Sequence, residues 1–284
     1  MRPTLVLTLP SLRAQPWLEA LDREGLAWVH WPLSEIKPDP RLSAPDLRAR
    51  IAASTWTLLP SPSAVIVLMR TLSEAGLAWP AGTGLGLVGP GSLRALEHWF
   101  DHVPGLRSAP QLMPVQAPFD AAALIAHPVL SEPGLVRGLR VLVLHRPDGQ
   151  DHWLRALVAR GARLEVFALY RQQTLRLDDH AQRWLRLAAE QLGADADACV
   201  GPGTGTSGLL LSVASRGAGT ALMQAAESMG LRNWLSRQIL LTHHPAIAQA
   251  MRATGFRRIE LHAPGVEACI ERMRTLESGQ LSSS

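Results

Sequence analysis

A single tyrosine stands among the 284 residues, and its hydroxyl is the first candidate for proton chemistry. Tyr170 follows an apolar, strand-like run at 163–169. A phenol keeps its proton at neutral pH and can donate it or share it in a hydrogen bond. We therefore take Tyr170 as the candidate catalytic donor. The alternative is that its hydroxyl closes a strand end through a hydrogen bond inside the fold.

Three segments combine hydroxyl side chains with glycine or proline near expected helix starts. The first N–H groups of a helix have no partner within it and suit anions such as carboxylates. The same hydroxyls could instead only cap their helices, and both interpretations stay open. The candidate anion-binding residues are Ser61 and Ser63, then Gly89, Pro90, Gly91 and Ser92, and finally Thr206 and Ser207.

Other patterns do not predict a cofactor or a metal. The glycines of Gly84-Leu-Gly-Leu-Val-Gly89 fit a dinucleotide motif in letters, but they lie inside an expected strand rather than opening a helix. The glycine-rich segment 201–208 lacks the Gly-Lys-Ser/Thr ending of a phosphate-binding loop. Successive side chains of a strand point to opposite faces, so His243 and His244 do not predict a metal site.

Strand-like and helix-like segments alternate, which predicts parallel sheets flanked by helices, an α/β fold. Two such halves indicate two lobes, with ligands at the carboxyl ends of strands. Pro32 to Pro40 is expected as an extended linker, and 277–284 as a disordered tail. Strands are expected at 4–9, 28–32, 57–59, 84–89, 140–144, 163–170, 238–242 and 258–262. Helices are expected at 15–23, 61–72, from 90, 153–160, after 170 through about 192, from 209, 220–229, 246–252 and 266–276.

Composition narrows the class of protein. The formal net charge is +4, yet no dense Lys/Arg block with interleaved aromatics marks a nucleic-acid surface. No apolar run reaches the ~18 residues of a membrane span, and the amino terminus lacks the pattern of a signal peptide. Cys199 and Cys269 stand far apart without metal-ligand spacing, as reduced thiols do. We expect a cytoplasmic monomer that binds neither nucleic acid nor membrane.

Several segments, in order, resemble the uroporphyrinogen-III synthase family over about residues 4–275. Each is a weak pattern alone, and their combination carries the resemblance. The segments are Thr8-Leu-Pro10 with Gln15 and 18–25, the prolines 32 and 38, Trp56 to Val65, Leu87-Val-Gly-Pro-Gly-Ser-Leu-Arg-Ala-Leu96, Gly138 to Leu144, Trp153 to Ala162, Tyr170-Arg171, Ile239 to Ile247, and Gly255-Phe256.

The resemblance implies a domain arrangement. Residues 1–31 and 173–276 would form a first, discontinuous lobe, and residues 41–163 a second. Segments 32–40 and 164–172 would form a two-stranded β connector between them. This is the expected architecture: two lobes of parallel sheets flanked by helices and joined by that connector.

The resemblance also implies an activity, the closure of hydroxymethylbilane to uroporphyrinogen III. This substrate is a linear tetrapyrrole with eight carboxylates. Loss of its terminal hydroxyl as water leaves an electrophilic end that the last pyrrole attacks with inversion of that ring. The enzyme must orient the chain and assist the leaving hydroxyl, and no cofactor is implied. Tyr170 is the residue that matches the family at the position of a donor.

Some positions depart from the family pattern. Leu9 replaces an expected Arg, Ala121 and Ala122 replace polar residues, and Gln150 replaces a second Arg. A further hydroxyl motif of the family is diffuse here, around 205–208. These departures favour an alternative, a diverged non-catalytic protein that binds a tetrapyrrole or another polyanion. A two-lobed receptor for small ligands shares the strand–helix pattern but would require a secretion signal.

Overall fold

The computed structural model describes residues 3–117, 119–147, 152–193 and 208–278. The chain divides into two compact units, unit 1 with 1–35 and 173–284, and unit 2 with 36–172. The chain passes between the units inside strands β3 (Ser34–Pro38) and β9 (Tyr170–Thr174), which pair in a two-stranded antiparallel sheet. The α/β class predicted from the alternating pattern is confirmed.

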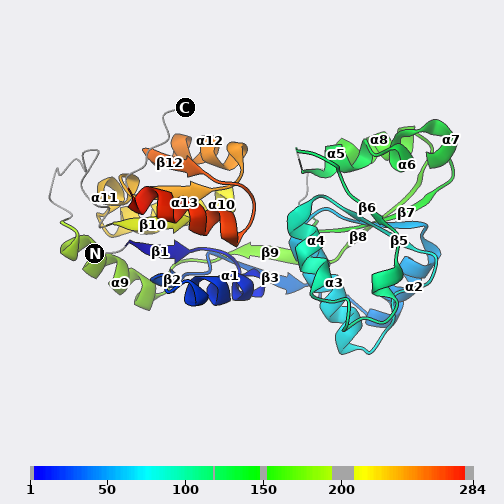
Figure 1. Ribbon diagram of the computed structural model, residues 1–284, viewed down its shortest axis with the longest axis horizontal. Coiled ribbons are helices and arrows are strands. Elements are labelled where there is room, and N and C mark those ends of the chain that lie inside the picture. The colour runs from blue at the N-terminus through cyan, green and yellow to red at the C-terminus, as the bar shows by residue number, and fades with distance from the viewer. Residues whose placement is uncertain (1–2, 118, 148–151, 194–207, 279–284) are drawn as a thin grey trace. The chain divides into compact units, whose positions relative to one another are not determined.

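Unit 1 is a five-stranded parallel sheet with helices on both faces (Figure 1). The strand order is β12 (Arg258–Leu261), β11 (Ile239–Thr242), β10 (Leu209–Ser212), β1 (Thr4–Leu7) and β2 (Trp28–His30). Helices α1 (Ser11–Arg23) and α13 (Val266–Glu277) pack on one face. The other face carries α9 (Asp179–Gln191), α10 (Arg216–Ser228), α11 (Arg232–Ser236) and α12 (Pro245–Thr254).

The helix expected from Leu209 is wrong, because Leu209–Ser212 is the central strand β10. All four residues are buried, Leu210 against α1 and α13, and Leu211 against the helices of the opposite face. A strand buried on both faces is apolar throughout and loses the alternation that would distinguish it from a helix. Glu277, the first residue of the expected tail, belongs to α13, and residues 279–284 lie outside the described residues.

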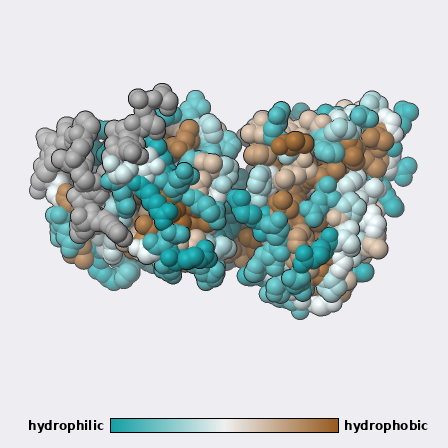
Figure 2. Space-filling view, in the orientation of Figure 1, coloured by the Kyte–Doolittle hydropathy of each residue, from teal (hydrophilic) through white to brown (hydrophobic). Residues whose placement is uncertain are grey.

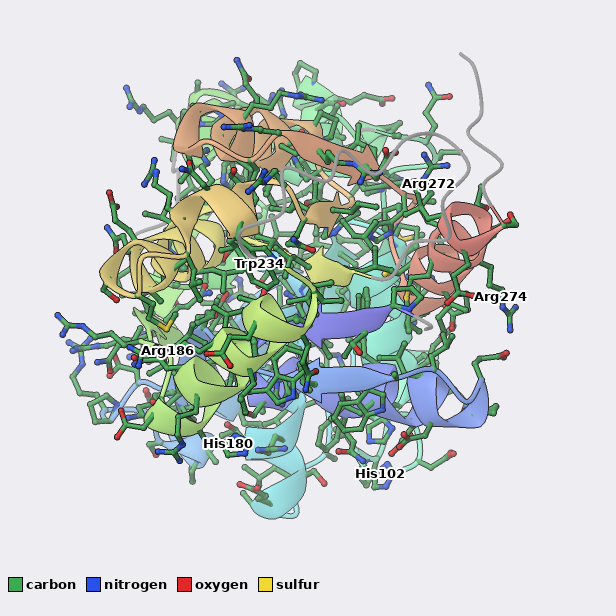
Figure 3. All side chains as sticks on the ribbon, turned by 90° about the vertical axis from the view of Figure 1, so that its left-hand side faces the viewer. His102, His180, Arg186, Trp234, Arg272 and Arg274 are labelled. Atoms are coloured by element: carbon green, nitrogen blue, oxygen red, sulfur yellow. The ribbon has the colours of Figure 1, made fainter. Side chains whose placement is uncertain are left out.

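Two ion pairs attach α13 to its surroundings within unit 1. Arg272 and Arg274 extend from this helix (Figure 3). Arg272 pairs with Glu260 of β12, and Arg274 pairs with Glu24 at the end of α1. Trp234 of α11, by contrast, is buried in the core on the other face of the sheet. Partly exposed pairs such as these contribute about 0–1 kcal/mol each, so apolar burial determines where α13 lies.

Unit 2 repeats this architecture with the strand order β6 (Gln111–Leu112), β5 (Gly84–Leu87), β4 (Trp56–Leu59), β7 (Arg140–His145) and β8 (Arg163–Ala168). All neighbouring strands are parallel. Helix α8 (His152–Ala159) and the short helices α5 (Ala121–Ile125), α6 (Pro128–Ser131) and α7 (Pro133–Val136) cover one face. Helix α2 (Ala44–Ala53) contacts β7, and α3 (Pro62–Glu74) contacts β4 and α4 (Pro90–Glu97).

The segment 164–172, expected as one connector strand, is divided between two sheets. Strand β8 pairs with β7 inside unit 2, and β9 starts at Tyr170. Leu169 separates them: its N–H donates to the carbonyl of His145, and its own carbonyl accepts from the N–H of Asp39. The expected linker at 32–40 contains strand β3, which pairs with β9.

The glycines of the dinucleotide-like motif serve packing. Gly84 and Gly86 lie inside β5, as the sequence predicted. A Cβ at Gly84 would lie 2.2 Å from the ring of Trp56, and one at Gly86 would lie 2.3 Å from a methyl carbon of Leu58. Side chains of the neighbouring strand β4 therefore occupy the space beside both glycines.

The visible face of each unit is a mosaic of hydrophilic and small hydrophobic areas (Figure 2). Among the described residues, no helix is long and apolar enough to cross a lipid bilayer. Cys269 of α13 is a buried free thiol, and burial raises its pKa to about 12. Cys199 lies outside the described residues.

A thiol-reactivity measurement tests the burial of Cys269. In a Cys199→Ser variant, we expect an aromatic disulfide reagent at pH 8 to label no thiol in the native protein. The thiolate is the reactive species, and both the raised pKa and the surrounding core oppose its formation and access. One thiol per chain should react at once after unfolding in guanidinium chloride. Fast labelling of the native variant would contradict the buried position.

Candidate active site

The predicted donor and a predicted anion-binding residue meet in unit 2. The hydroxyl oxygen of Tyr170 lies 3.0 Å from Oγ of Ser61, a contact between residues 109 positions apart. Tyr170 is 4 % exposed, so its ring is packed in the fold while its hydroxyl has a polar partner. The alternative for Tyr170 was a hydrogen bond inside the fold. Such a hydrogen bond exists, and it connects Tyr170 to another candidate site residue.

Ser61 is placed by the transition from β4 to α3. It is the N-cap of α3, and its Oγ accepts the N–H of Ala64 at 3.1 Å. Pro62 follows at the first helical position, where a missing N–H costs nothing. A serine hydroxyl has one hydrogen and two lone pairs, so Ser61 can accept from Ala64 and still donate to Tyr170. The phenol proton then remains available.

Ser61 also lies at the usual ligand position of this type of sheet. Strand β4 stands between β5, which follows it in the chain, and β7, which begins the second half of the unit. From β4 the chain first adds strands on the β5 side and later on the β7 side. In sheets of this type, the carboxyl ends of the strands at such a reversal, here β4 and β7, are the usual ligand position. The pair of Ser61 and Tyr170 lies at this end of β4.

The second predicted loop forms the start of α4. Gly89 is its N-cap, and Gly91 approaches Pro62 of α3, since a Cβ on Gly91 would lie 3.7 Å from the Pro62 ring. The amino ends of α3 and α4 are thus adjacent. A Cβ at Gly89 would lie 2.6 Å from Cβ of Phe119, a half-exposed aromatic residue that the sequence argument did not single out.

The remaining predicted hydroxyl residues differ in whether the structure describes them and in their hydrogen bonds. Ser63 is buried in the first turn of α3. Ser92, in the first turn of α4, is 1 % exposed, and its Oγ has no hydrogen-bond partner among the described residues. Thr206 and Ser207 lie outside the described residues. Within the described ranges, no group of three His, Cys, Asp or Glu side chains is arranged to hold a metal ion.

A buried carboxylate next to Tyr170 escaped the sequence argument. Asp39, whose side chain is 1 % exposed, accepts the backbone N–H and the guanidinium of Arg41, and Nε of Arg171 lies 3.6 Å from it. The hydrogen bonds from Arg41, with the charge of Arg171, lower the pKa of Asp39 to about 2. Asp39 thereby fixes the chain where β9 begins. Only its position between two prolines hinted at a structural role.

The lowered pKa of Asp39 predicts a pH-dependent contribution to stability. The carboxylate stabilises the fold fully above its unfolded pKa of 3.8, and this contribution is lost as pH falls toward about 2. Asp39→Asn should therefore melt at a lower temperature than wild type at pH 7, and the difference should shrink as pH falls below 4. Thermal unfolding followed by circular dichroism at several pH values measures it. A difference that stays constant down to pH 2 would contradict the ionised pair.

Comparison with models of known protein families shows to which family the chain belongs. The model of the family described as uroporphyrinogen-III synthase HemD matches residues 15–271. The chain belongs to the uroporphyrinogen-III synthase family. The predicted resemblance is confirmed, and with it the activity: the protein is a lyase of tetrapyrrole and heme biosynthesis that closes hydroxymethylbilane to uroporphyrinogen III.

Solved structures of uroporphyrinogen-III synthases are similar to this chain along nearly its whole length. A mutant uroporphyrinogen III synthase from Thermus thermophilus is 16 % identical, with 98 % of this chain and 100 % of that chain covered and a TM-score of 0.50, and it shares the fold. A uroporphyrinogen-III synthetase from Helicobacter pylori is 15 % identical, with 97 % and 100 % covered and a TM-score of 0.49. Comparison with curated proteins finds no match.

Two of the departures from the family pattern have structural roles here. Leu9, at the position expected to hold Arg, is 2 % exposed and packs with Leu7 and Ala14. Ala121, the first residue of α5, packs against the core of unit 2, and Asp120, which is not a departure, caps this helix by accepting the N–H of Ala123. Gln150 lies outside the described residues. Leu9 and Ala121 thus contribute to the fold through apolar packing.

Proposed function

We propose that Tyr170 is the proton donor for the leaving hydroxyl of hydroxymethylbilane, and that Ser61 positions it. The observation that carries this proposal is the 3.0 Å contact between the two hydroxyl oxygens at the end of β4. In this proposal the Ser61 hydroxyl donates to the phenolic oxygen, one of the two directions that the contact allows, while it accepts the N–H of Ala64. The phenol proton is thus directed to a third atom, which is the substrate hydroxyl.

The proposed step balances protons and electrons without a cofactor. The phenol proton passes to the hydroxyl oxygen, the carbon–oxygen bond breaks with its electron pair on oxygen, and water leaves. The pyrrole nitrogen supplies electrons to the carbon left behind, giving the azafulvenium cation, which keeps its N–H and whose charge balances that of the phenolate. The terminal pyrrole attacks through its substituted carbon, and the spiro product fragments and recloses with that ring inverted. A proton released on rearomatisation restores the phenol, whose anion the Ser61 hydroxyl stabilises meanwhile.

The adjacent starts of α3 and α4 are the proposed binding site for substrate carboxylates. Pro62 and Pro90 have no N–H. The N–H groups of Ala64 and Ser92 donate to Ser61 and Gly89, so the N–H groups of Ser63 and Gly91 are the proposed donors. The positive ends of both helix dipoles favour negative charge there. Ser63 and Ser92 stand in these first turns, and the buried Ser92 hydroxyl has no partner among the described residues. Thr206 and Ser207 are proposed for the same task in unit 1. Hydrogen bonds from these groups would hold the flexible chain for ring inversion.

Charge at Gly91 tests the carboxylate site. This position is half-buried and has room for a side chain, and an acidic residue in a first helical turn stabilises the helix. Gly91→Asp should nevertheless raise KM about tenfold, because its charge repels a bound carboxylate by on the order of 1 kcal/mol. Gly91→Asn, nearly identical in shape, should change KM far less. Equal KM values for the two variants would remove α4 from substrate binding.

The activity is measured in a coupled assay. Porphobilinogen and a deaminase supply the substrate, and chromatography separates the type III from the type I product. Wild-type protein should convert most substrate to the type III isomer, whereas spontaneous closure gives type I. A product mixture unchanged by added protein would support the alternative, a protein that binds tetrapyrroles without catalysis.

We further propose that the enzyme acts as a cytoplasmic monomer on this small-molecule substrate, without nucleic acid or membrane partners. The Cys269 free thiol, the composition without a dense basic block and the two complete cores in one chain support this proposal. Light scattering after gel filtration should give the mass of one chain, 30.8 kDa. A mass of twice this value would contradict the proposal that the enzyme is a monomer.

A further inference from the structure

Two histidines follow the last turn of α4 with a spacing of four residues. His98 is the C-cap of α4, and His102 stands four positions later. The chain continues in helical turns here, since the N–H groups of His102 and Val103 both donate to the carbonyl of Trp99. Residues four apart lie on the same face of such turns, so the two imidazoles are neighbours. The sequence argument did not single out this pair.

The two imidazole rings lie close together and are open to solvent. Their centres are 5.5 Å apart, with an angle of 19° between the ring planes. Both residues are exposed, and His102 lies at the surface in Figure 3. Two rings that share one ion at metal–nitrogen distances of about 2.0–2.1 Å have centres roughly 4.5–6 Å apart. The terminal torsion of an exposed histidine is soft, so both nitrogens can turn toward one ion.

The hydrogen bond of His102 leaves a nitrogen available for a metal ion. Nδ1 of His102 lies 3.0 Å from the carbonyl of His98, which can only accept. Nδ1 therefore carries the hydrogen of the neutral ring, and Nε2 carries the lone pair. Metal-bound histidines commonly donate their other N–H to such a carbonyl, which fixes the ring and makes the bound nitrogen a stronger ligand.

The indole of Trp99 supports both rings. Its centre lies 5.3 Å from that of His98 at 88°, and 5.8 Å from that of His102 at 71°. Trp99 is half-buried, and the turns that carry the pair are anchored by Leu96 and Val103, each 0 % exposed. The two ligands are thus partly ordered before an ion arrives, which lowers the entropy lost on binding.

The charges of this segment permit a cation. Arg94 and Arg107 are positive, and Glu97 and Asp101 are negative, so their formal charges cancel. Arg107 pairs with Asp101 at 2.8 Å. The carboxyl end of the α4 dipole adds partial negative charge next to His98. A divalent ion at the histidine pair therefore meets no excess of positive charge along this segment.

We propose that His98 and His102 form a surface site for a divalent transition-metal ion, with Cu²⁺ preferred. Within the described ranges, no third His, Cys, Asp or Glu side chain completes a ligand set, so water supplies the other ligands and the ion exchanges. Two nitrogens with water suit the tetragonal coordination of Cu²⁺, which binds nitrogen ligands more tightly than Ni²⁺ or Zn²⁺. The proposal does not depend on the tetrapyrrole chemistry.

The metal site and the proposed carboxylate site lie at opposite ends of α4. A rise of 1.5 Å per residue places His98 about 12 Å along the helix axis from Pro90. An ion at His98 therefore leaves the N–H of Gly91 uncovered. Substitution of either histidine should leave kcat and KM for the type III product unchanged in metal-free buffer.

The emission of Trp99 reports on the site. A paramagnetic ion next to an indole quenches its fluorescence, so titration of the full chain with Cu²⁺ should quench part of the emission and saturate at one ion per chain. Electron paramagnetic resonance of the bound ion should show hyperfine splitting from two nitrogens. Trp99→Phe should lose the saturating quench and keep this splitting, because the indole is a reporter and not a ligand.

Three histidine variants locate the ion. His98→Gln and His102→Gln each remove one ligand and should weaken Cu²⁺ binding by at least about tenfold. His180→Gln, at another exposed histidine, on α9, is the matched control and should bind as the wild type does. All three positions are exposed, so the melting temperature of the metal-free protein should stay nearly the same.

Two results would overturn the proposal. One is the absence of a saturating Cu²⁺ site, or a site that survives both substitutions at His98 and His102. The other is loss of binding in His262→Gln instead, which would move the ion to His243 and His262, whose ring centres are 6.1 Å apart. Neither result concerns Tyr170, because the coupled assay measures its role without added metal.

Discussion

Tyr170→Phe is expected to lower kcat for the type III product by about 10²-fold, near the low end of what general acid catalysis contributes. KM should change little, because the hydroxyl acts on the leaving group in the transition state rather than on the carboxylates. The aromatic ring is retained in its buried site, and the lost contact with Ser61 costs on the order of 1 kcal/mol of stability. Isomer-resolved chromatography of the coupled assay measures the loss.

Ser61→Ala provides the control for this prediction. A residue that acts through Tyr170 should cause a smaller fall, about tenfold, and should alter the pH profile of kcat because the phenol then lacks its donor. The substitution also removes the cap of α3, which costs about 1 kcal/mol, so both variants are compared at a temperature where each is folded. A Tyr170→Phe enzyme with wild-type kcat would reduce the hydroxyl pair to a structural hydrogen bond.

Leu211→Ala is expected to lower the free energy of unfolding by about 2–5 kcal/mol. Leu211 is 0 % exposed at the centre of the unit 1 sheet and belongs to the core beneath α9 to α12. Removing its side chain leaves a cavity that a central strand, paired on both sides, cannot close by moving. Urea unfolding followed by circular dichroism gives the midpoint and the slope, from which the loss is calculated.

The matched control is Leu187→Ala on α9 of the same unit. Leu187 is 55 % exposed, and the same deletion there should cost less than about 0.5 kcal/mol. If Leu211→Ala were equally mild, β10 would not be the buried centre of the sheet.

The sequence predicted most elements whose signal is local. The run of β-branched and aliphatic residues at 140–144 predicts the strand that the structure has at Arg140–His145, and the hydroxyl and proline at the start of α3 predict that helix. The α/β class followed from the alternation of such elements. The failure at Leu209–Ser212 has the opposite cause, since a short strand buried on both faces has no periodicity to read.

Tyr170 and Ser61 could each be selected from residue type and position, because a lone phenol and a helix-capping hydroxyl carry chemistry by themselves. Their contact could not be predicted, since the order and register of the strands bring together residues 109 positions apart. The same holds for Asp39 with Arg171, and for His243 with His262, which meet because β11 and β12 are neighbours. Sequence alone thus determined the family, most of the element types and the candidate groups. Only the tertiary structure decided which groups touch, because parallel pairing places the ends of distant strands at one edge of a sheet.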